Sequence, residues 1–592
     1  MERLELLRDE MNKHNISAYI IPTGDYHNTE YVCEHFACRK YVSGFTGSAG
    51  TLVVLKDKAA LWTDGRYFIQ AADQLKDTGI DLMKSGQPET VSLEQYITDS
   101  LKEGESVGFD GKVVSMQDYR KWMHAFDFHH LNVVNDIDLV DSIWNDRPSL
   151  PATNTFHYDE KYAGYSIDEK LEMVRVKMKE LHARSMVITR LDEIAWLFNL
   201  RARDIPCYPV ALAYAVVTLN GGNIYIDDSR LDDVSSDLFE KNNINTLPYN
   251  QIYEDVSNLE APVLYDPSTV NSLLGSLIGT SAVEEASPII LMKACKNEVE
   301  LKNTKNAHLK DAVAVTRFIY WLKRNVGLQT ITEVSAQEKL MAYRRRQQLY
   351  IEDSFDTICA YKEHAALMHY KADPNNETEL EKEGMLLVDS GGQYLDGTTD
   401  ITRTIVLGPI SREEKKWFTL ALRSHIRLAK ANWLYGCRGV NLDILARGPL
   451  WDENMDYQCG TGHGVGHLSN VHESPNGFRW RIVPERNDNC VLEEGMIQSN
   501  EPGVYVEGEF GIRHENEYVV VKGEKNFYGQ FMHMDCLTYV PFDRDGIDTS
   551  LLTKDELKWI NDYHKEVFDR ISPYMGVDEY KWLKEVCHPI II

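Results

Sequence analysis

The sequence predicts a mixed α/β and α+β fold, with two related α/β domains followed by a C-terminal domain of different architecture. The chain has 592 residues, too many for one hydrophobic core, so two to four domains are expected. A weak internal repeat lies in the first half, and from about residue 384 the pattern changes to short strands with Gly-rich turns. The pattern of expected helices and strands therefore differs between the N-terminal and C-terminal parts of the chain.

The repeat joins residues 4–21 to residues 171–188, which align without a gap, so that Leu4 matches Leu171. Each copy has the pattern of an amphipathic helix that runs into a short apolar strand. Two related α/β domains would explain the match. Chance similarity between two helix–strand units is the alternative.

Two connectors mark candidate boundaries between domains. One is the Pro-bearing segment 144–151, and the other lies at 287–296. They predict a first domain over residues 1–146, a second over 147–296 and a third over 297–592.

Two helices are predicted in the C-terminal domain. Residues 298–324 carry apolar residues near helical spacing. Near the end of the chain Thr553 and Glu556 have the spacing of a capping box, and Ser572 followed by proline would end the helix that begins there.

The composition is ordinary for a globular protein, with 43% hydrophobic and 26% charged residues. The formal net charge of −28 argues against nucleic acids and anionic membranes as partners. The first residues show no signal-peptide pattern, and no apolar stretch is long enough to predict a transmembrane helix. The ten cysteines are scattered, which favours free thiols in a reducing cytosol.

The segment 385–407 is the first that carries chemistry. An apolar strand ends at Asp389, and a second strand runs from Asp400. Asp396-Gly397 is a hairpin-type turn signal between them, so the two aspartates can converge from neighbouring strands. The alternative is two aspartates in turns, which is the usual position of this residue.

The segment 459–473 holds His463, His467 and His472. The first two have the spacing of a zinc pair on a helix, but the alternating glycines disfavour a helix. A Gly-rich loop that brings one or two imidazoles close to a ligand is expected instead. A surface loop with incidental histidines is the alternative.

The segment 495–519 adds further carboxylates. Glu501 precedes a proline, which biases its backbone toward extended or turn geometry. Arg513 and Glu515 lie two residues apart on an expected strand and would share a face. An exposed, salt-bridged strand face is the alternative for that pair.

The order of these segments is more specific than any one of them. The chain resembles the metal-dependent peptidases of the pita-bread fold, and among them the long, three-domain aminopeptidase P group. The resemblance is carried by four motifs in this order: D-x10-D, GTGHGVG, NEPG and GIRHEN. The resemblance extends over nearly the whole chain. Further segments that carry it are TDGRYFIQAA at 63–72, LDEIAWLFNLR at 191–201 and DSGGQYLDGTTDITRT at 389–404. It implies two creatinase-like N-terminal domains, then a pita-bread catalytic domain that releases the first residue of X-Pro-X peptides.

The resemblance also implies a site with two metal ions. Asp389 would serve one ion, and His463 and Glu501 would serve the other. Asp400 and Glu515 would bridge both. Four carboxylates held together repel one another unless cations intervene, and two divalent ions would balance their charge. The family usually prefers manganese, which suits oxygen-rich ligation.

Other residues match positions that act on the peptide in this family. Glu501 would be the general base, and His369 and His472 would donate hydrogen bonds to the oxygen where negative charge develops. Arg513 and, in the first domain, Arg66 match substrate-contacting arginines. Peptides with N-terminal X-Pro are thus the expected partners, and a cytoplasmic homodimer is the expected form.

Two positions depart from the family pattern. Cys459 stands where many relatives carry a histidine, and His467 stands where some carry a small or aromatic residue. Neither is among the five expected ligands, so activity itself is still expected. The two departures would affect fine substrate preference and sensitivity to oxidation.

Three rival functions share the pita-bread fold. A prolidase cleaves only X-Pro dipeptides, and it typically has a single N-terminal domain. An inactive binding module typically loses metal ligands, whereas all five are present here. A creatinase-like reaction on a small non-peptide is disfavoured for the same reason.

Overall fold

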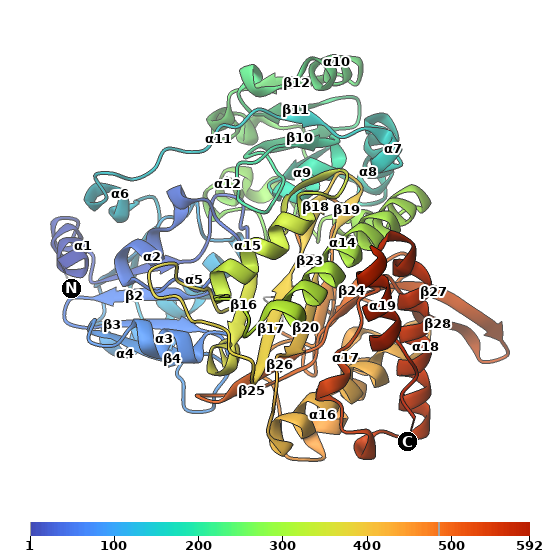
Figure 1. Ribbon diagram of the computed structural model, residues 1–592. Helices are drawn as coiled ribbons and strands as arrows, with labels where there is room; N and C mark the ends of the chain where they lie inside the picture. The colour runs from blue at the N-terminus through green and yellow to red at the C-terminus, as the bar shows by residue number, and fades with distance from the viewer. Residues whose placement is uncertain (1, 484–485, 592) are drawn as a thin grey trace. The chain divides into compact units, whose positions relative to one another are not determined.

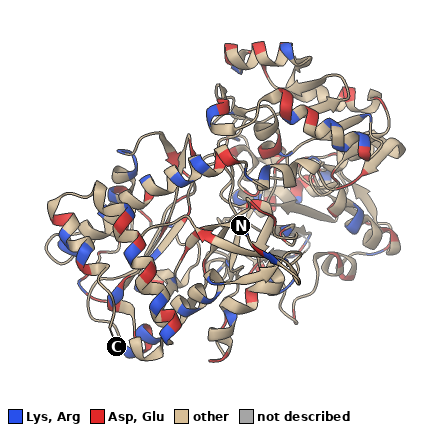
Figure 2. Ribbon diagram, turned by 90° about the vertical axis from the view of Figure 1, so that its right-hand side faces the viewer, with Lys and Arg blue, Asp and Glu red and all other residues tan. Residues whose placement is uncertain are grey.

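The computed structural model describes residues 2–483 and 486–591, and the chain divides into two compact units, Met1–Ile290 and Leu291–Ile592 (Figure 1). The domain boundaries expected near residues 146 and 296 stay predictions. Acidic and basic residues alternate along many of the helices (Figure 2). Within the described part of the chain, none of the helices has both the length and the apolarity needed to cross a bilayer.

The first unit contains two six-stranded sheets of the same design. Their orders are β4-β3-β2-β1-β5-β6 and β12-β11-β10-β8-β13-β14. In each sheet three neighbouring strands are antiparallel, and the strands added on either side are parallel. The strands of the first sheet are β1 (Ala18–Pro22), β2 (Thr51–Leu55), β3 (Ala59–Thr63), β4 (Ile80–Lys84), β5 (Ser106–Gly108) and β6 (Asn132–Val134). Those of the second are β8 (Ser185–Ile188), β10 (Tyr214–Thr218), β11 (Gly222–Tyr225), β12 (Ile244–Leu247), β13 (Val263–Tyr265) and β14 (Ala282–Glu284).

The sequence repeat corresponds to equivalent parts of these two sheets. Helix α1 (Glu2–Lys13) leads into β1, and helix α8 (Ile167–Glu180) leads into β8, at the same place in the strand order. Ser166 and Glu169 form a capping box that begins α8. The helix–strand reading of both copies is confirmed, and the matching topology argues against chance similarity.

Shorter elements complete the first unit. They are α2 (Cys38–Ser43), α3 (Phe68–Gln74), α4 (Leu93–Ser100), α5 (Met116–Phe128), α6 (Leu139–Ile143), β7 (Phe156–His157), α7 (Glu160–Ala163), α9 (Leu191–Leu197), β9 (Leu200–Arg201), α10 (Asp233–Lys241), α11 (Ile252–Asp255) and α12 (Ser272–Ile278). Helix α13 (Pro288–Ala294) spans the division between the two units.

The second unit is built of smaller sheets. One sheet has the order β16-β17-β20, a second β15-β18-β19, a third β21-β28-β27-β24-β22-β23, and β25 pairs with β26. The strands are β15 (Tyr350–Asp353), β16 (Ile358–Tyr361), β17 (Met385–Ser390), β18 (Gly392–Tyr394), β19 (Gly397–Thr398), β20 (Ile401–Val406), β21 (Asn432–Leu434), β22 (Gly462–Gly464), β23 (Glu473–Phe478), β24 (Ile497–Asn500), β25 (Gly503–Val506), β26 (Phe510–Arg513), β27 (Asn516–Asn526) and β28 (Gly529–Cys536).

Helices pack against these sheets. They are α14 (Glu298–Asn325), α15 (Glu333–Arg344), α16 (Arg412–Ala429), α17 (Gly439–Trp451), α18 (Lys554–Ile571) and α19 (Val577–Val586). The expected helix over 298–324 is confirmed as α14. The capping box of Thr553 and Glu556 begins α18, which ends before Ser572 as expected.

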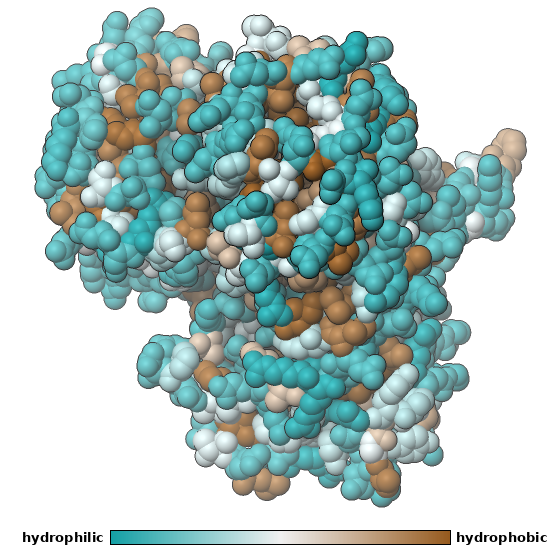
Figure 3. All heavy atoms as spheres, turned by 90° about the horizontal axis from the view of Figure 1, so that it is seen from above, coloured by the Kyte–Doolittle hydropathy of each residue, from teal (hydrophilic) through white to brown (hydrophobic). Residues whose placement is uncertain are grey.

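The hairpin of β27 and β28 extends beyond the other strands of the second unit (Figure 1). Its turn carries Phe527 and Tyr528, which are 97% and 77% exposed, and Figure 3 shows hydrophobic atoms at the end of a projecting hydrophilic arm. The other end of β27 lies next to Glu515. One strand therefore connects a solvent-exposed turn to the buried interior.

A buried ion pair holds the hairpin that precedes Asp400. Asp311 on α14 accepts hydrogen bonds from Nε and Nη2 of Arg344 at 2.7 and 3.0 Å. It also accepts from the hydroxyls of Tyr394 and Thr399 at 2.8 and 2.9 Å. All four hydrogen bonds converge on one fully buried carboxylate. Helix α14 therefore fixes the chain at Thr399, one residue before Asp400.

Arg344→Met should destabilise the second unit strongly, because it leaves the Asp311 carboxylate buried without its cation. We expect the free energy of unfolding to fall by about 3–5 kcal/mol. Urea denaturation of the full chain would measure this as a lower midpoint. The matched control is Lys565→Met, which removes an exposed helical pair with Asp569 and should leave the midpoint nearly unaltered. Equal losses in the two variants would contradict the role of the buried pair.

Candidate metal centre

The two aspartates of the first segment come together as expected. Strand β17 is antiparallel to β20, with Asp389 paired to Thr402, and Asp400 directly precedes β20. The intervening residues form the short strands β18 and β19, with Asp396 in the turn between them. The predicted convergence of Asp389 and Asp400 from neighbouring strands is confirmed.

The Gly-rich segment forms the short strand β22, not a helix, and His463 lies at its centre. A Cβ at Gly462 would lie 2.0 Å from the carbonyl oxygen of Ser499, so only glycine lets the two backbones approach this closely. The amide of Glu501 in turn donates to the carbonyl of Thr461 at 2.8 Å. These contacts bring His463 and Glu501 together.

Arg513 and Glu515 do not share one strand, so that expectation is wrong. Strand β26 ends at Arg513 and β27 begins at Asn516, and Glu515 lies between them. The amide of Glu515 donates to the carbonyl of Thr402 at 3.2 Å. This contact turns the backbone and places Glu515 beside β20.

The candidate ligand atoms lie close to one another. His463 Nε2 is 3.5 Å from Asp400 Oδ2 and 3.2 Å from Glu501 Oε1. One ligand atom each from Asp400, His463 and Glu515 lies within 4.8 Å of the others, which is close enough to hold a metal ion. Asp389 is connected to this group through Arg513, with which it forms an ion pair.

Several buried carboxylate oxygens at this point have no hydrogen-bond donor. Among the residues that the structure describes, Asp389 Oδ1, Asp400 Oδ1 and Glu515 Oε1 are buried without a hydrogen-bond partner. Burying a charged oxygen without a partner is costly, so such a group requires a proton or a cation. Three carboxylate oxygens and one imidazole nitrogen match the ligand preferences of Mn²⁺. The residues present therefore fit a divalent metal site.

The electrostatics of the cluster agree with this fit. Burial, and then the charges of Glu515 and Asp389, raise the pKa of Asp400 well above its usual range. Burial, and then the charges of Glu501 and Asp389, do the same to the pKa of Glu515. Without a cation, the charged forms of these two carboxyls are therefore disfavoured.

Glu501 and His463 form the opposite kind of pair. Burial opposes the charge on Glu501, but its hydrogen bond to His463 and the positive charge of that ring lower its pKa to about 2. Burial also opposes the charge on His463, but Glu501 raises the pKa of the ring to about 9. His463 Nδ1 lies 2.9 Å from the carbonyl of Gly464, and that acceptor requires the proton to be on Nδ1. The Nε2 atom therefore faces Asp400 and Glu501.

The two expected substrate histidines border the cluster. The ring of His472 meets that of His463 edge-on, with centroids 4.3 Å apart. His369 lies in the turn after the 3-10 helix η6 (Lys362–Ala366), next to Met368, whose carbonyl is 3.5 Å from Arg513 Nη2. His472 is in direct contact with a candidate ligand, and His369 is linked to the cluster through its neighbour.

The hydrogen bonds of Arg513 go to protein groups. Its guanidinium pairs with Asp389, donates to the Tyr505 hydroxyl at 2.7 Å and lies 3.3 Å from Thr402 Oγ1. These contacts orient a candidate metal ligand. The expected contact of Arg513 with substrate stays a prediction.

Arg66 lies in the first unit and pairs with carboxylates there. Its Nε and Nη2 atoms each donate to Asp64 at 2.9 Å, and Nη1 is 3.3 Å from Glu30. Its side chain is largely buried. These local contacts account for its charge, and its expected role toward substrate stays a prediction.

The two positions that depart from the family pattern have different surroundings. His467 is buried, and its Nδ1 lies 3.0 Å from the hydroxyl of Thr304 on α14. Burial, and then the charge of Glu501, raise the pKa of the Cys459 thiol to about 11. Little thiolate forms at neutral pH, which disfavours rapid oxidation of this cysteine.

Two hydroxyls support the candidate ligands. The Ser499 hydroxyl, to which the sequence did not point, accepts from the amide of His463 at 2.9 Å, so its own proton goes to Glu501 Oε1 at 3.0 Å. The Thr402 hydroxyl lies 2.6 Å from Glu515 Oε2. Strand alternation predicts Thr402 on the face of Asp400, in agreement with this contact.

A second buried acid–base pair lies behind the cluster. His308 Nε2 on α14 is 3.0 Å from Glu517 Oε2, and both side chains are fully buried. Nothing local in the sequence marks His308, which is 209 residues away from its partner.

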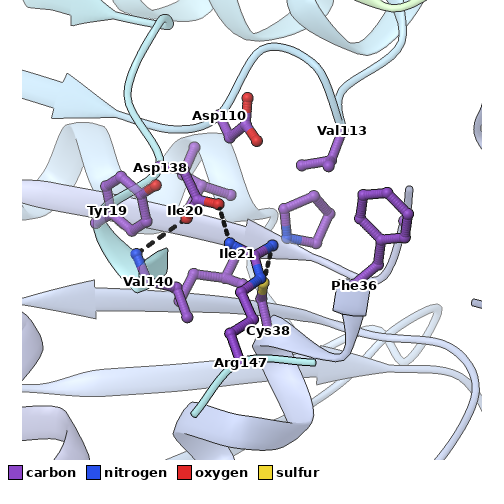
Figure 4. Close-up of a pocket in the computed structure, with 12 residues that line it drawn as sticks. Tyr19, Ile20, Ile21, Phe36, Cys38, Asp110, Val113, Asp138, Val140 and Arg147 are labelled. Atoms are coloured by element: carbon purple, nitrogen blue, oxygen red, sulfur yellow. Dashed lines mark hydrogen bonds and ion pairs between the residues drawn. The ribbon is translucent and has the colours of Figure 1, made fainter. Parts of the chain in front are cut away.

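A small cavity in the first unit offers no alternative peptide site (Figure 4). Arg147 donates there to Asp138 at 2.6 Å and to the Cys38 sulfur at 3.3 Å. The cavity volume is about 20 Å³, which is room for about one water molecule. A peptide cannot enter it.

Comparison with known proteins assigns each part of the chain to a family. Residues 3–142 and 146–300 each match the creatinase/prolidase N-terminal domain. Residues 302–522 match metallopeptidase family M24, and residues 530–590 match the C-terminal region of that peptidase. The expected fold class, creatinase-like domains followed by a pita-bread domain, is confirmed.

Relatives align over the full length of the chain. Aminopeptidase P2 of Arabidopsis thaliana is 38% identical over 97% of this chain and 86% of its own length. Xaa-Pro aminopeptidase 1 of Dictyostelium discoideum is 36% identical over 100% of this chain and 96% of its own length.

Solved structures agree. The X-prolyl aminopeptidase of Caenorhabditis elegans, described as a cytosolic enzyme with a dinuclear active site, superimposes with a TM-score of 0.95 at 34% identity, covering 100% of this chain and 99% of its own. An Xaa-Pro dipeptidase of Bacillus anthracis shares only the fold, with a TM-score of 0.51 at 21% identity over 64% of this chain and 99% of its own. The chain belongs to metallopeptidase family M24, within the group of long, three-domain aminopeptidase P proteins.

Proposed function

We propose that this chain is a metal-dependent aminopeptidase that releases the N-terminal residue from peptides with proline in second position. The observation that carries the proposal is the cluster of Asp400, His463 and Glu515. Within it, Asp400 Oδ1 and Glu515 Oε1 are buried without a hydrogen-bond donor. Aminopeptidase P relatives that align over the full chain support the choice of substrate. The dinuclear site of the Caenorhabditis elegans enzyme supports the use of two ions.

We propose that Asp389, Asp400, His463, Glu501 and Glu515 hold two divalent ions, with Mn²⁺ as the preferred metal. Asp400 and Glu515 would bridge the ions, Asp389 would serve one, and His463 and Glu501 the other. When bound, the ions would supply a hydroxide nucleophile at neutral pH. Four carboxylates balance two divalent charges, so the site would be close to neutral.

The residues around the ligands have separate tasks in this proposal. Glu501 would relay protons as the general base, and the Ser499 hydroxyl holds one of its oxygens in place. His369 and His472 would donate hydrogen bonds to the carbonyl oxygen as it becomes negative. Arg513 would orient Asp389, and Arg66 and Arg513 stay candidates for contact with the peptide.

Proline explains the need for a specialised site. Its nitrogen has no N–H, so peptidases that require that donor discriminate against the bond before proline. We also propose a cytoplasmic location, supported by the cytosolic description of the Caenorhabditis elegans enzyme. The expected homodimer stays a prediction.

The purified chain loaded with Mn²⁺ should cleave an X-Pro-X tripeptide, and chelation should abolish this activity. Product analysis should show a free first residue, with no cleavage of an X-Ala-X peptide. Hydrolysis of the X-Pro dipeptide but not of the tripeptide would make the chain a prolidase instead. Metal binding without any hydrolysis would favour the inactive binding module.

Glu501→Gln should lower kcat by at least about 10²–10⁴-fold, because the general base and one ligand charge are lost while the side-chain shape is kept. Circular dichroism should show an unchanged fold. The matched control is Glu566→Gln on the exposed face of α18, which should leave kcat unaltered. Near-parental turnover in the Glu501 variant would place the proton relay elsewhere.

His472→Asn should lower kcat by about 10²–10³-fold, since one donor to the developing oxyanion is removed. His533→Asn, at an exposed strand position, is the control and should be neutral. If the His472 variant changes KM alone, the ring binds substrate but does not stabilise the transition state.

Metal affinity should rise with pH above the ordinary carboxyl pKa of about 4, because the ions must displace protons from Asp400 and Glu515. Both carboxyls have raised pKa values, so the metal-free fold is favoured when they are protonated and loses stability as pH rises through those values. The gap in Tm between Mn²⁺-loaded and metal-free chain should therefore widen with pH. A gap that is constant with pH would argue against ion binding at these carboxyls.

A further inference from the structure

The turn that carries His369 is attached to one buried carboxylate. Glu333 is the first residue of α15, and its side chain is only 1% exposed. Its carboxylate accepts hydrogen bonds from groups in the segment 361–370.

Glu333 holds this segment at its beginning, middle and end. The amide of Tyr361, the last residue of β16, donates to Oε1 at 2.7 Å. His364 Nδ1 lies 3.0 Å from Oε1 and 3.2 Å from Oε2. The hydroxyl of Tyr370, the residue after His369, donates to Oε2 at 2.7 Å.

The two side-chain donors also support each other. The rings of His364 and Tyr370 stack with centroids 4.6 Å apart and an angle of 22° between their planes. A carboxylate only accepts hydrogen bonds, so His364 must carry its proton on Nδ1. The segment is thereby closed into a loop whose two ends meet at Glu333.

The opposite side of the loop contacts β26 and Arg513, next to the candidate metal ligands. A Cβ at Gly511 on β26 would lie 1.7 Å from the carbonyl oxygen of Ala365, so the loop lies directly against that strand. Met368 accepts from Arg513, which also pairs with Asp389. His369 therefore lies between an anchor at Glu333 and an anchor at the candidate ligands.

We propose that Glu333 is a positioning residue for His369, and that it acts through the Tyr370 hydroxyl and the His364 ring. The hydrogen bonds of Glu333 go to Tyr361, His364 and Tyr370, which are not candidate ligands. Glu333 fixes the neighbour of His369, and hydrogen bonds to a charged acceptor are among the stronger ones in proteins. A histidine that donates to a developing oxyanion must be held within a fraction of an ångström, because a shift of about 1 Å can cost about 10²-fold in rate.

This inference rests on the proposed function, in which His369 serves the hydrolysis of X-Pro-X peptides. Tyr370→Phe in the Mn²⁺-loaded full chain removes one hydroxyl and its hydrogen bond to Glu333. We expect kcat to fall about tenfold and KM to change less than about twofold, because the loss concerns the transition state. Glu333→Gln should cost more, since all three contacts lose the charged acceptor. Metal content should be unaltered in both variants.

The matched control is Tyr435→Phe. The Tyr435 hydroxyl also donates to a glutamate, Glu493, at 2.7 Å, but on the surface of the same unit. This variant should keep the parental kcat. If Tyr370→Phe and Tyr435→Phe behave alike, the proposal is overturned.

A double-mutant cycle separates positioning from general damage. In a His369→Asn background, Tyr370→Phe should have no further effect on kcat, because its target is already absent. A further tenfold loss in that background would mean that Tyr370 acts by another route, and would overturn the proposal. Tyr370→Phe keeps the test available even where Glu333→Gln fails to fold.

The parental chain distinguishes the two levels of the hypothesis. If the Mn²⁺-loaded chain cleaves no X-Pro-X peptide, the proposed function fails and the positioning role fails with it. If the parental chain is active and Tyr370→Phe is equally active, the positioning role alone is wrong.

Discussion

Mutual repulsion of buried carboxylates is the constraint on which the second unit depends. Asp389, Asp400, Glu501 and Glu515 are gathered from several different strands and strand ends. Burial, and then the negative charges of the neighbouring carboxylates, make Asp400 and Glu515 hard to ionise. A fold gains nothing from this arrangement in isolation, since a buried like-charge cluster is unfavourable. The arrangement is reasonable only if cations are part of the folded state, which is why the family assignment and the geometry lead to the same chemistry.

The polar framework around the cluster keeps the repelling groups in place. Two examples are the Thr399 hydroxyl, which donates to Asp311, and the Ser499 hydroxyl, which donates to Glu501. Glu333 extends the same principle to a residue that would face the substrate. Buried polar networks of this kind stabilise only when they are fully satisfied, so they specify one geometry.

Much of this organisation could be predicted from the sequence, and the exceptions have physical reasons. Repeat, hairpin and capping signals are local, so α8, the convergence of Asp389 with Asp400, and α18 all followed from short patterns. The break between Arg513 and Glu515 could not be read in this way, because the backbone there bonds to Thr402, which is distant in the chain. His308 and Glu333 were also missed, since each acquires its role only through partners distant in the chain.

The projecting β27–β28 hairpin offers a practical handle on the buried centre. Its exposed turn at Phe527 and Tyr528 lies at the far end of the strand that begins beside Glu515, on the order of 30 Å along the chain. Loop tips of this kind accept insertions with little effect on the interior. A fluorophore or an affinity tag placed there would move with the strand next to the ligands, and could report on metal loading or immobilise the protein without covering the site.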